Sequence, residues 1–141
     1  MNRRSAIKML AGSAVMLGTT RAQSKASRVQ IASLDKLESV WSVVQYPYEG
    51  RHAILLRVPE KIKDRTLEVQ IGIYLVSYHL VCTHLGCTPA LPNTDHQLIC
   101  PCHNSRFWAE DGRTADARPN PPLKAIQLEV NNGMVFAIGY L

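Results

Sequence analysis

All four cysteines of this 141-residue chain lie in two short segments, together with two of its five histidines. Cys82 and His84 form a Cys-x-His pair, and Cys100 and His103 form a Cys-x-x-His pair. Thiolate sulfur and imidazole nitrogen are the ligands that soft and borderline metal ions prefer. Two short loops that each supply one thiolate and one imidazole can therefore surround a small metal centre.

The two pairs alone leave several chemistries open. Their four side chains can bind Zn²⁺ as a tetrahedral Cys₂His₂ site. They can also hold a larger inorganic centre, which leaves over Cys87 and Cys102, one in each segment. In an oxidising compartment the four cysteines can instead form two disulfides, with the histidines incidental. The other histidines, His52, His79 and His96, lack a partner pattern, and we expect surface or packing roles for them.

The full segments CTHLGC, residues 82–87, and CPCHNSRF, residues 100–107, closely resemble the paired motifs of Rieske iron-sulfur proteins of the disulfide-containing subclass. Gly86, the two additional cysteines and Ser105 belong to that pattern, and they count against the zinc and plain-disulfide interpretations. The stretch PNPPL, residues 119–123, resembles the proline-rich loop beside the cluster in this family. Elsewhere the chain matches the family only in its strand pattern.

The resemblance implies a 2Fe-2S cluster in which two cysteines bind the buried iron and two histidines bind the outer iron. By position, the implied ligands are Cys82 and Cys100 for the inner iron and His84 and His103 for the outer iron. The resemblance also implies a disulfide between Cys87 and Cys102. Because neutral imidazoles replace two thiolates, such a cluster is reduced more easily than one with four cysteine ligands.

Two of the residues that follow His103 bear on the redox potential of such a cluster. In high-potential members of the family, a serine at the position of Ser105 donates a hydrogen bond to a bridging sulfide, and a tyrosine at the position of Phe107 donates one to a ligand sulfur. Donors that stabilise the more negative reduced cluster raise its potential. Since Phe107 has no hydroxyl, we expect a potential between those of members with both donors and with neither. Asn104 replaces the usual glycine and tolerates the same left-handed turn.

The first 23 residues have the parts of an export signal: a basic start, an apolar middle and a region of small residues. Arg3 and Arg4, followed by SAIK, resemble the twin-arginine signal pattern. The uncharged run at 9–20 would reach about 18 Å as a helix, against roughly 30 Å for the hydrocarbon core of a bilayer. We therefore expect a periplasmic protein that is exported folded, with membrane contact only through a retained leader.

The basic charge of the chain lies largely in that leader. Four of the 16 basic residues and none of the 11 acidic residues fall within residues 1–22, so the remainder is nearly neutral. A nearly neutral body argues against nucleic acid as a partner. No Ser-His-Asp arrangement, phosphate loop or acid pair stands out either, and the sequence predicts no independent catalytic site.

Short strands predict an all-β domain over residues 24–141. Apolar, β-branched or alternating runs occur at 40–46, 53–58, 67–71, 73–81, 126–130 and 134–138, and Asn-Asn-Gly at 131–133 is typical of a hairpin turn. The charged stretch at 60–65 is expected to be a surface loop. Residues from about 80 to 122 are rich in Cys, His and Pro. The sequence therefore predicts an antiparallel sandwich or barrel that carries a loop-built, cluster-binding subdomain.

A cluster without a catalytic domain implies electron transfer with protein partners. The leader and Phe107 make the chain similar to the small subunit of arsenite oxidase. That resemblance implies electrons that come from a molybdopterin subunit and pass to a cytochrome c or a small copper protein. The alternatives are the Rieske subunit of a quinol-oxidising cytochrome bc complex and a free-standing periplasmic carrier. Ferredoxins of dioxygenase systems lack the additional cysteine pair and the export signal, which counts against a carrier of that type.

Overall fold

The computed structural model of the protein describes residues 26–83, 86–118 and 120–141. The predicted export segment, 1–23, the predicted ligand His84 and Pro119 lie outside the described residues. Within them, the regular structure is nine strands and one short 3₁₀ turn, η1 (Leu34–Leu37). All strand pairs are antiparallel, which confirms the predicted all-β class.

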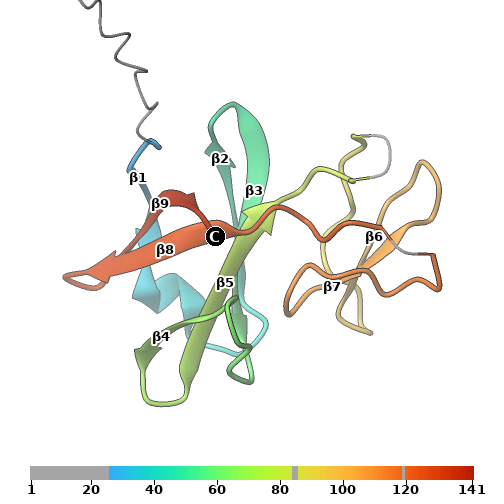
Figure 1. The fold of residues 1–141 in the computed structure, drawn as a ribbon. Helices are drawn as coiled ribbons and strands as arrows, with labels where there is room; N and C mark the ends of the chain where they lie inside the picture. The colour runs from blue at the N-terminus through green and yellow to red at the C-terminus, as the bar shows by residue number, and fades with distance from the viewer. Residues whose placement is uncertain (1–25, 84–85, 119) are drawn as a thin grey trace, which may run out of the picture.

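Two sheets form the base of the molecule (Figure 1). The smaller has the order β1-β9-β8, and the larger has the order β2-β3-β5-β4. The strands of the smaller sheet are β1 (Val29–Ser33), β9 (Met134–Tyr140) and β8 (Ile126–Asn131). Those of the larger are β2 (Val43–Tyr48), β3 (Arg51–Val58), β5 (Ile73–His79) and β4 (Leu67–Gln70).

The larger sheet is buried on both faces at its centre, because the residues of β3 and β5 alternate between two cores. From β3, Ala53 and Leu55 pack with residues of β8 and β9, while Ile54 and Leu56 pack with residues of the cysteine-containing insert. A strand buried on both faces reads as a continuous apolar run, as residues 53–58 do. The base thus offers an apolar platform on which the insert rests.

The insert leaves the end of β5 and returns to the start of β8, so it projects to one side of the base in Figure 1. It contains the short pair β6 (Gln97–Ile99) and β7 (Arg106–Trp108), and is otherwise built from loops. Leu98, Cys100 and Phe107 of the insert are buried, and they belong to the same core as residues of β3 and β5. The predicted loop-built subdomain is therefore present, with one small hairpin at its centre.

Two polar or aromatic contacts fasten the insert to the base. The hydroxyl of Tyr78 in β5 donates to the carbonyl of Ala109. The ring of Trp41 stacks on that of His96, with centroids 3.8 Å apart and planes 8° from parallel. Both contacts bridge segments more than 30 residues apart, so they fix the insert relative to the sheets.

The predicted strands are confirmed with shifted ends. The strand predicted at 40–46 runs from Val43 to Tyr48 and includes Pro47. Proline is tolerated there because β2 is an edge strand, where one row of N–H groups needs no partner. The turn at 131–133 joins β8 to β9, with positive φ at Asn132 and Gly133. The predicted surface loop at 60–65 is mostly exposed.

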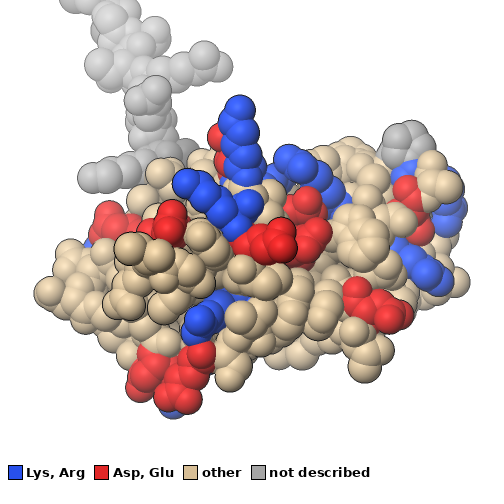
Figure 2. Space-filling model, turned by 90° about the horizontal axis from the view of Figure 1, so that it is seen from below, with Lys and Arg blue, Asp and Glu red and all other residues tan. Residues whose placement is uncertain are grey.

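Strand β1 and the pair β6–β7 were not anticipated by the sequence pattern, because each is short and only partly apolar. In the part of the chain that is described, no helix has the length and apolar character required to span a bilayer. On the face shown in Figure 2, basic and acidic side chains are interspersed, as expected for a nearly neutral body.

Candidate metal centre

The two cysteine-containing loops share one pattern of backbone hydrogen bonds. In the first, the Cys82 N–H donates to the Cys87 carbonyl at 2.6 Å and the Gly86 N–H donates to the Cys82 carbonyl at 2.8 Å. In the second, the Cys100 N–H donates to the Ser105 carbonyl at 2.8 Å, and the Asn104 N–H to the Cys100 carbonyl at 2.9 Å. Each loop thus closes around the cysteine that begins it.

Each turn also needs a left-handed residue four positions after that cysteine. Gly86 has φ of 75° and Asn104 has φ of 54°. Glycine has no steric penalty there, and asparagine tolerates the conformation better than most residues. The expectation that Asn104 preserves the turn is confirmed. Gly86 and Asn104 stand four residues after Cys82 and Cys100, and this matching position is the signal in the sequence for two equivalent loops.

The first cysteine of each loop is buried and faces the other. Cys82 is 3% exposed and Cys100 is 0% exposed, and neither is in a disulfide. Burial raises the pKa of the Cys100 thiol, and its hydrogen bond with Cys82 raises it further, while backbone N–H groups of Cys102 and His103 oppose this. Two thiols are therefore held together beneath the surface, with N–H donors aimed at one of the sulfurs.

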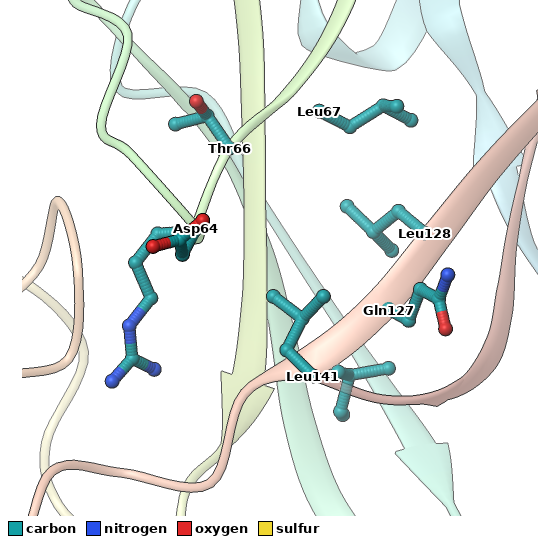
Figure 3. Close-up of a pocket in the computed structure, with 8 residues that line it drawn as sticks. Asp64, Thr66, Leu67, Gln127, Leu128 and Leu141 are labelled. Atoms are coloured by element: carbon teal, nitrogen blue, oxygen red, sulfur yellow. The ribbon is translucent and has the colours of Figure 1, made fainter.

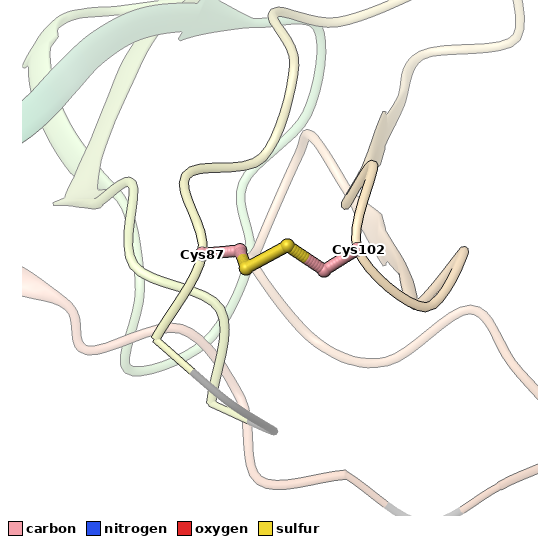
Figure 4. Close-up of a disulfide and its surroundings, with 2 residues drawn as sticks. All are labelled: Cys87 and Cys102. Carbon is pink, nitrogen blue, oxygen red and sulfur yellow. A yellow bond between two sulfur atoms is a disulfide. The ribbon is translucent and has the colours of Figure 1, made fainter.

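Cys87 and Cys102 form the predicted disulfide, with Cα atoms 6.4 Å apart (Figure 4). The sulfur atoms of Cys87, Cys100 and Cys102 all lie within 4.8 Å of one another. Since the first and third are bonded to each other, Cys100 is the free thiol of this group. The disulfide therefore joins the two loops directly beside a predicted iron ligand.

The predicted outer ligands differ in what the structure describes. His103 is exposed at the tip of the second loop, and its carbonyl accepts a hydrogen bond from the Arg118 guanidinium at 3.4 Å. His84 belongs to the first loop by sequence but lies outside the described residues. The assignment of Cys82, His84, Cys100 and His103 as ligands stays a prediction. The described part of the site is arranged as this prediction requires.

Ser105 and Phe107, predicted to tune the cluster, are both buried. Ser105 is 1% exposed and Phe107 is 0% exposed. Phe107 belongs to the same apolar core as Cys82 and Cys100, and it pairs with Leu98 across the β6–β7 hairpin. Phe107 is thus a packing residue beneath the loops, and its side chain supplies no hydrogen bond.

The proline-rich segment lies against the first loop, and Arg118, just before it, contacts the second. The hydroxyl of Thr83 donates to the carbonyl of Pro121 at 2.7 Å, and Arg118 contacts the second loop through the carbonyl of His103. The sequence-based resemblance of 119–123 to a flanking loop agrees with these contacts for the residues that are described. The site thus combines predicted sulfur ligands that are buried with an exposed loop that carries His103.

The three remaining histidines have packing or surface positions, as expected. His96 stacks on Trp41, His52 is exposed, and His79 is 3% exposed and contacts Tyr140. The environment of His79 is more polar than a packing role requires, a feature that its lone position in the sequence could not signal.

A hollow of about 190 Å³ lies elsewhere, between the loop before β4 and strand β8 (Figure 3). Leu67, Leu128 and Leu141 line it together with Asp64 and other residues. None of its lining residues belongs to the cysteine loops, so it is unrelated to the metal centre.

The donor set fits a 2Fe-2S cluster with mixed ligands. Such a cluster needs two adjacent thiolates for one iron and two imidazoles for the other. Cys82 and Cys100 are adjacent and buried, the Cys100 sulfur has N–H donors directed to it, and His103 is on the solvent side of the same loop. Hydrogen bonds to ligand sulfur are the usual second sphere of iron-sulfur centres.

Curated relatives of this chain are iron-sulfur subunits of cytochrome complexes, and each matches part of it. The chain is 42% identical over 55 residues to cytochrome b6-f complex iron-sulfur subunit 2 of Nostoc, covering 39% of this chain and 30% of that protein. It is 33% identical over 84 residues to the cytochrome bc1 complex Rieske iron-sulfur subunit of Streptomyces lividans, covering 57% and 49%. The chain therefore spans only about a third to a half of these relatives.

Solved structures with the same fold are more distant in sequence. The plasma membrane Rieske protein PetC3 of Synechocystis matches with a TM-score of 0.57 at 16% identity, over 77% of this chain and 97% of that one. The model of the Rieske [2Fe-2S] domain matches residues 45–127, more than half of the chain and all of both cysteine loops. This chain therefore belongs to the Rieske [2Fe-2S] family, and its cofactor is a 2Fe-2S cluster.

Proposed function

We propose that the protein is the Rieske electron-transfer subunit of a quinol-oxidising complex of the cytochrome bc or b6f type. When bound, the 2Fe-2S cluster accepts and releases one electron. The observation that carries the proposal is the position of His103, exposed at the tip of a loop whose first cysteine is fully buried. The relatives described above, which are named as subunits of cytochrome b6-f and bc1 complexes, support this choice of partner.

The residues of the chain divide the task. Cys82 and Cys100 hold the inner side of the centre away from water, while the loop of His103 reaches the surface where a partner can approach. An exposed imidazole can accept a hydrogen bond from a quinol. The disulfide and the β6–β7 hairpin keep this loop in place during the exchange.

The second candidate is a subunit of an arsenite-oxidase-like molybdenum enzyme, which passes electrons to a cytochrome c or a copper protein. The observation that favours it is Phe107, which is buried under the cluster loops and has no hydroxyl. The export-signal pattern of residues 1–23 also supports this candidate. We propose for either role that these residues direct folded export to the periplasm and that residues 24–141 form the Rieske domain.

The partner can be identified by the cofactors that accompany the protein. The chain, tagged at its C-terminus and expressed in its own organism, is purified from detergent-solubilised membranes and from the soluble fraction. We expect b-type haem to co-purify in fixed ratio with the chain, measured by its absorption spectrum. Molybdenum in fixed ratio instead, measured by elemental analysis, would establish the second candidate. The absence of both haem and molybdenum from every fraction that contains the chain would favour a free-standing carrier.

Export is tested separately, with the protein produced in a strain that lacks the twin-arginine translocase. The proposal expects the protein to stay in the cytoplasm of that strain. Replacing both arginines with lysines, Arg3→Lys and Arg4→Lys, is expected to have the same effect in a strain with the translocase. Normal export in both cases would contradict the proposed route.

A further inference from the structure

Three side chains form a hydrogen-bonded chain from the interior to the surface beside the metal centre. Nε2 of the buried His79 lies 3.0 Å from the hydroxyl oxygen of Tyr140. That hydroxyl donates to the carboxylate of Glu49 at 2.5 Å. Glu49 is exposed, so solvent reaches the outer end of the chain. The three residues come from β5, β9 and the turn between β2 and β3.

Both ring nitrogens of His79 face an oxygen that accepts. Nδ1 lies 3.4 Å from the carbonyl of His52, and a carbonyl is only an acceptor. The hydroxyl of Tyr140 has one proton, which it donates to Glu49, so its oxygen can only accept from Nε2. A neutral imidazole has one N–H and can satisfy one of these oxygens, whereas an imidazolium satisfies both. The site therefore has a place for one additional proton.

The surroundings oppose that proton without excluding it. Burial lowers the pKa of His79, the His52 carbonyl opposes this, and the charges of Lys124 and Arg51 lower it while that of Glu49 raises it. The ring also lies against those of Tyr48 and Tyr140. The titratable and charged groups that face His79 are thus Tyr48, Glu49, Arg51, Lys124 and Tyr140.

The site adjoins the metal centre through two hollows. One, of about 280 Å³, is lined by Glu49, Arg51, His79, Lys124 and Tyr140. The other, of about 400 Å³, shares Arg51, His79 and Lys124 with the first and continues to Cys82 and Thr83. His79 also precedes Cys82 by three residues, which is at most about 10 Å of extended chain. A charge on His79 therefore lies close enough to act on a negative charge beside Cys82.

We propose that the His79–Tyr140–Glu49 group is a proton-binding site linked to the redox state of the centre and distinct from the predicted ligand histidines. A proton from solvent binds the ring nitrogen of His79 that carries no hydrogen in the neutral form, and the resulting imidazolium donates to the His52 carbonyl and to Tyr140. One electron from an external donor makes the centre more negative, which the imidazolium stabilises. Electron and proton uptake therefore favour each other, whichever partner supplies the electron.

The linkage appears in how the midpoint potential depends on pH. Because the imidazolium stabilises the reduced form, the potential rises as pH falls through the titration of His79, below about 6.5. Redox titrations of the cluster-loaded protein, followed by electron paramagnetic resonance from pH 4.5 to 8, should show this acidic bend. The bend should be absent from His79→Gln. Its absence from the wild type, or its persistence in His79→Gln, would overturn the proposal.

Two surface variants test the site without altering its buried residue. Glu49→Gln removes a charge that favours the imidazolium, so the bend should move to lower pH by about a few tenths of a unit. Lys124→Met removes a charge that disfavours it, so the bend should move to higher pH by a similar amount. Lys63→Met is the matched control, an exposed lysine in the loop before β4, and should leave the bend in place. Shifts of equal sign in the first two variants, or no shift, would refute the assignment.

Discussion

At the scale of single residues, the properties of the centre depend on which side chains touch the cluster and which only pack beneath it. Phe107 is the clearest case, because it is fully buried in the core that also contains Cys82 and Cys100. The family places a hydroxyl at this position when the potential is high. A buried phenylalanine at this position therefore fits a cluster that lacks one of the hydrogen-bond donors that stabilise its reduced form.

Phe107→Tyr is expected to raise the midpoint potential. A new hydrogen bond to a ligand sulfur would stabilise the reduced form more than the oxidised form, and each kcal/mol of difference corresponds to about 40 mV for one electron. Redox titration of the wild type and the variant measures the change. Phe107→Leu is the control, because it changes packing without adding a donor and should not raise the potential. An unchanged or lower potential in Phe107→Tyr would show that the hydroxyl does not reach the sulfur.

His79 also gives the protein a pH-dependent stability. Its pKa in the folded state is lowered from 6.5, chiefly by burial, so the unfolded chain binds the proton more readily. The unfolded state then holds more protons below pH 6.5, and stability falls as pH decreases through that range. Urea unfolding at pH 7 and pH 5.5 should show a smaller loss for His79→Gln than for the wild type. An equal loss in both proteins would assign the acid sensitivity to other groups.

At the scale of elements, the two ligand loops act as one unit because they are closed in the same way and bonded to each other. The disulfide between Cys87 and Cys102 spans 15 residues of sequence. Crosslinking a loop of this length restricts the unfolded chain and contributes about 3 kcal/mol in the chain-entropy description.

The double variant Cys87→Ala, Cys102→Ala is therefore expected to lose about 3 kcal/mol of unfolding free energy. It should also release its cluster faster, since the loops lose their covalent link. Urea unfolding and the decay of the visible absorption of the cluster measure the two effects. A reducing agent should weaken the wild type but not the variant. Equal stability of variant and wild type would show that the hydrogen bonds of the loops suffice.

Gly112 marks the place where the insert turns back toward the proline-rich loop. Its φ is 71°, and a Cβ atom there would lie 3.2 Å from Cβ of Leu123. Gly112→Ala should therefore destabilise the fold by about 1–3 kcal/mol. Gly50→Ala is the control, since Gly50 has φ of 75° but open space around it. If urea unfolding gives equal losses for both variants, strain and not crowding limits position 112.

Much of this element scale was predictable from sequence, for identifiable reasons. The β8–β9 hairpin followed from alternating residues around Asn131-Asn132-Gly133, because alternation and turn residues act locally. The cysteine pairing and the left-handed turn at Asn104 followed from the motif. Strand β1 did not, since its five residues pair with β9 more than 100 positions away. The chain joining His79, Tyr140 and Glu49 was likewise invisible, because three distant segments meet only in the folded sheets.

At the scale of the whole molecule, the base and the insert have separate tasks. The base sheets provide an apolar surface beneath the insert, and the stacked pair Trp41–His96 fixes its position. The insert carries the cluster loops outward on the side of the molecule away from the β8–β9 hairpin (Figure 1). This arrangement suits a carrier of electrons, whose centre must be shielded from water and still lie near the surface.

The proposed metal centre is tested most directly by determining the ligand set of the cluster. The reduced protein, labelled with ¹⁵N-histidine, is examined by electron paramagnetic resonance and nuclear coupling spectroscopy. We predict an S = 1/2 signal with coupling to two histidine nitrogens, and loss of one coupling in each of the variants His84→Ser and His103→Ser. A silent spectrum, as zinc would give, or a signal without histidine coupling would contradict the assignment of this chain's site.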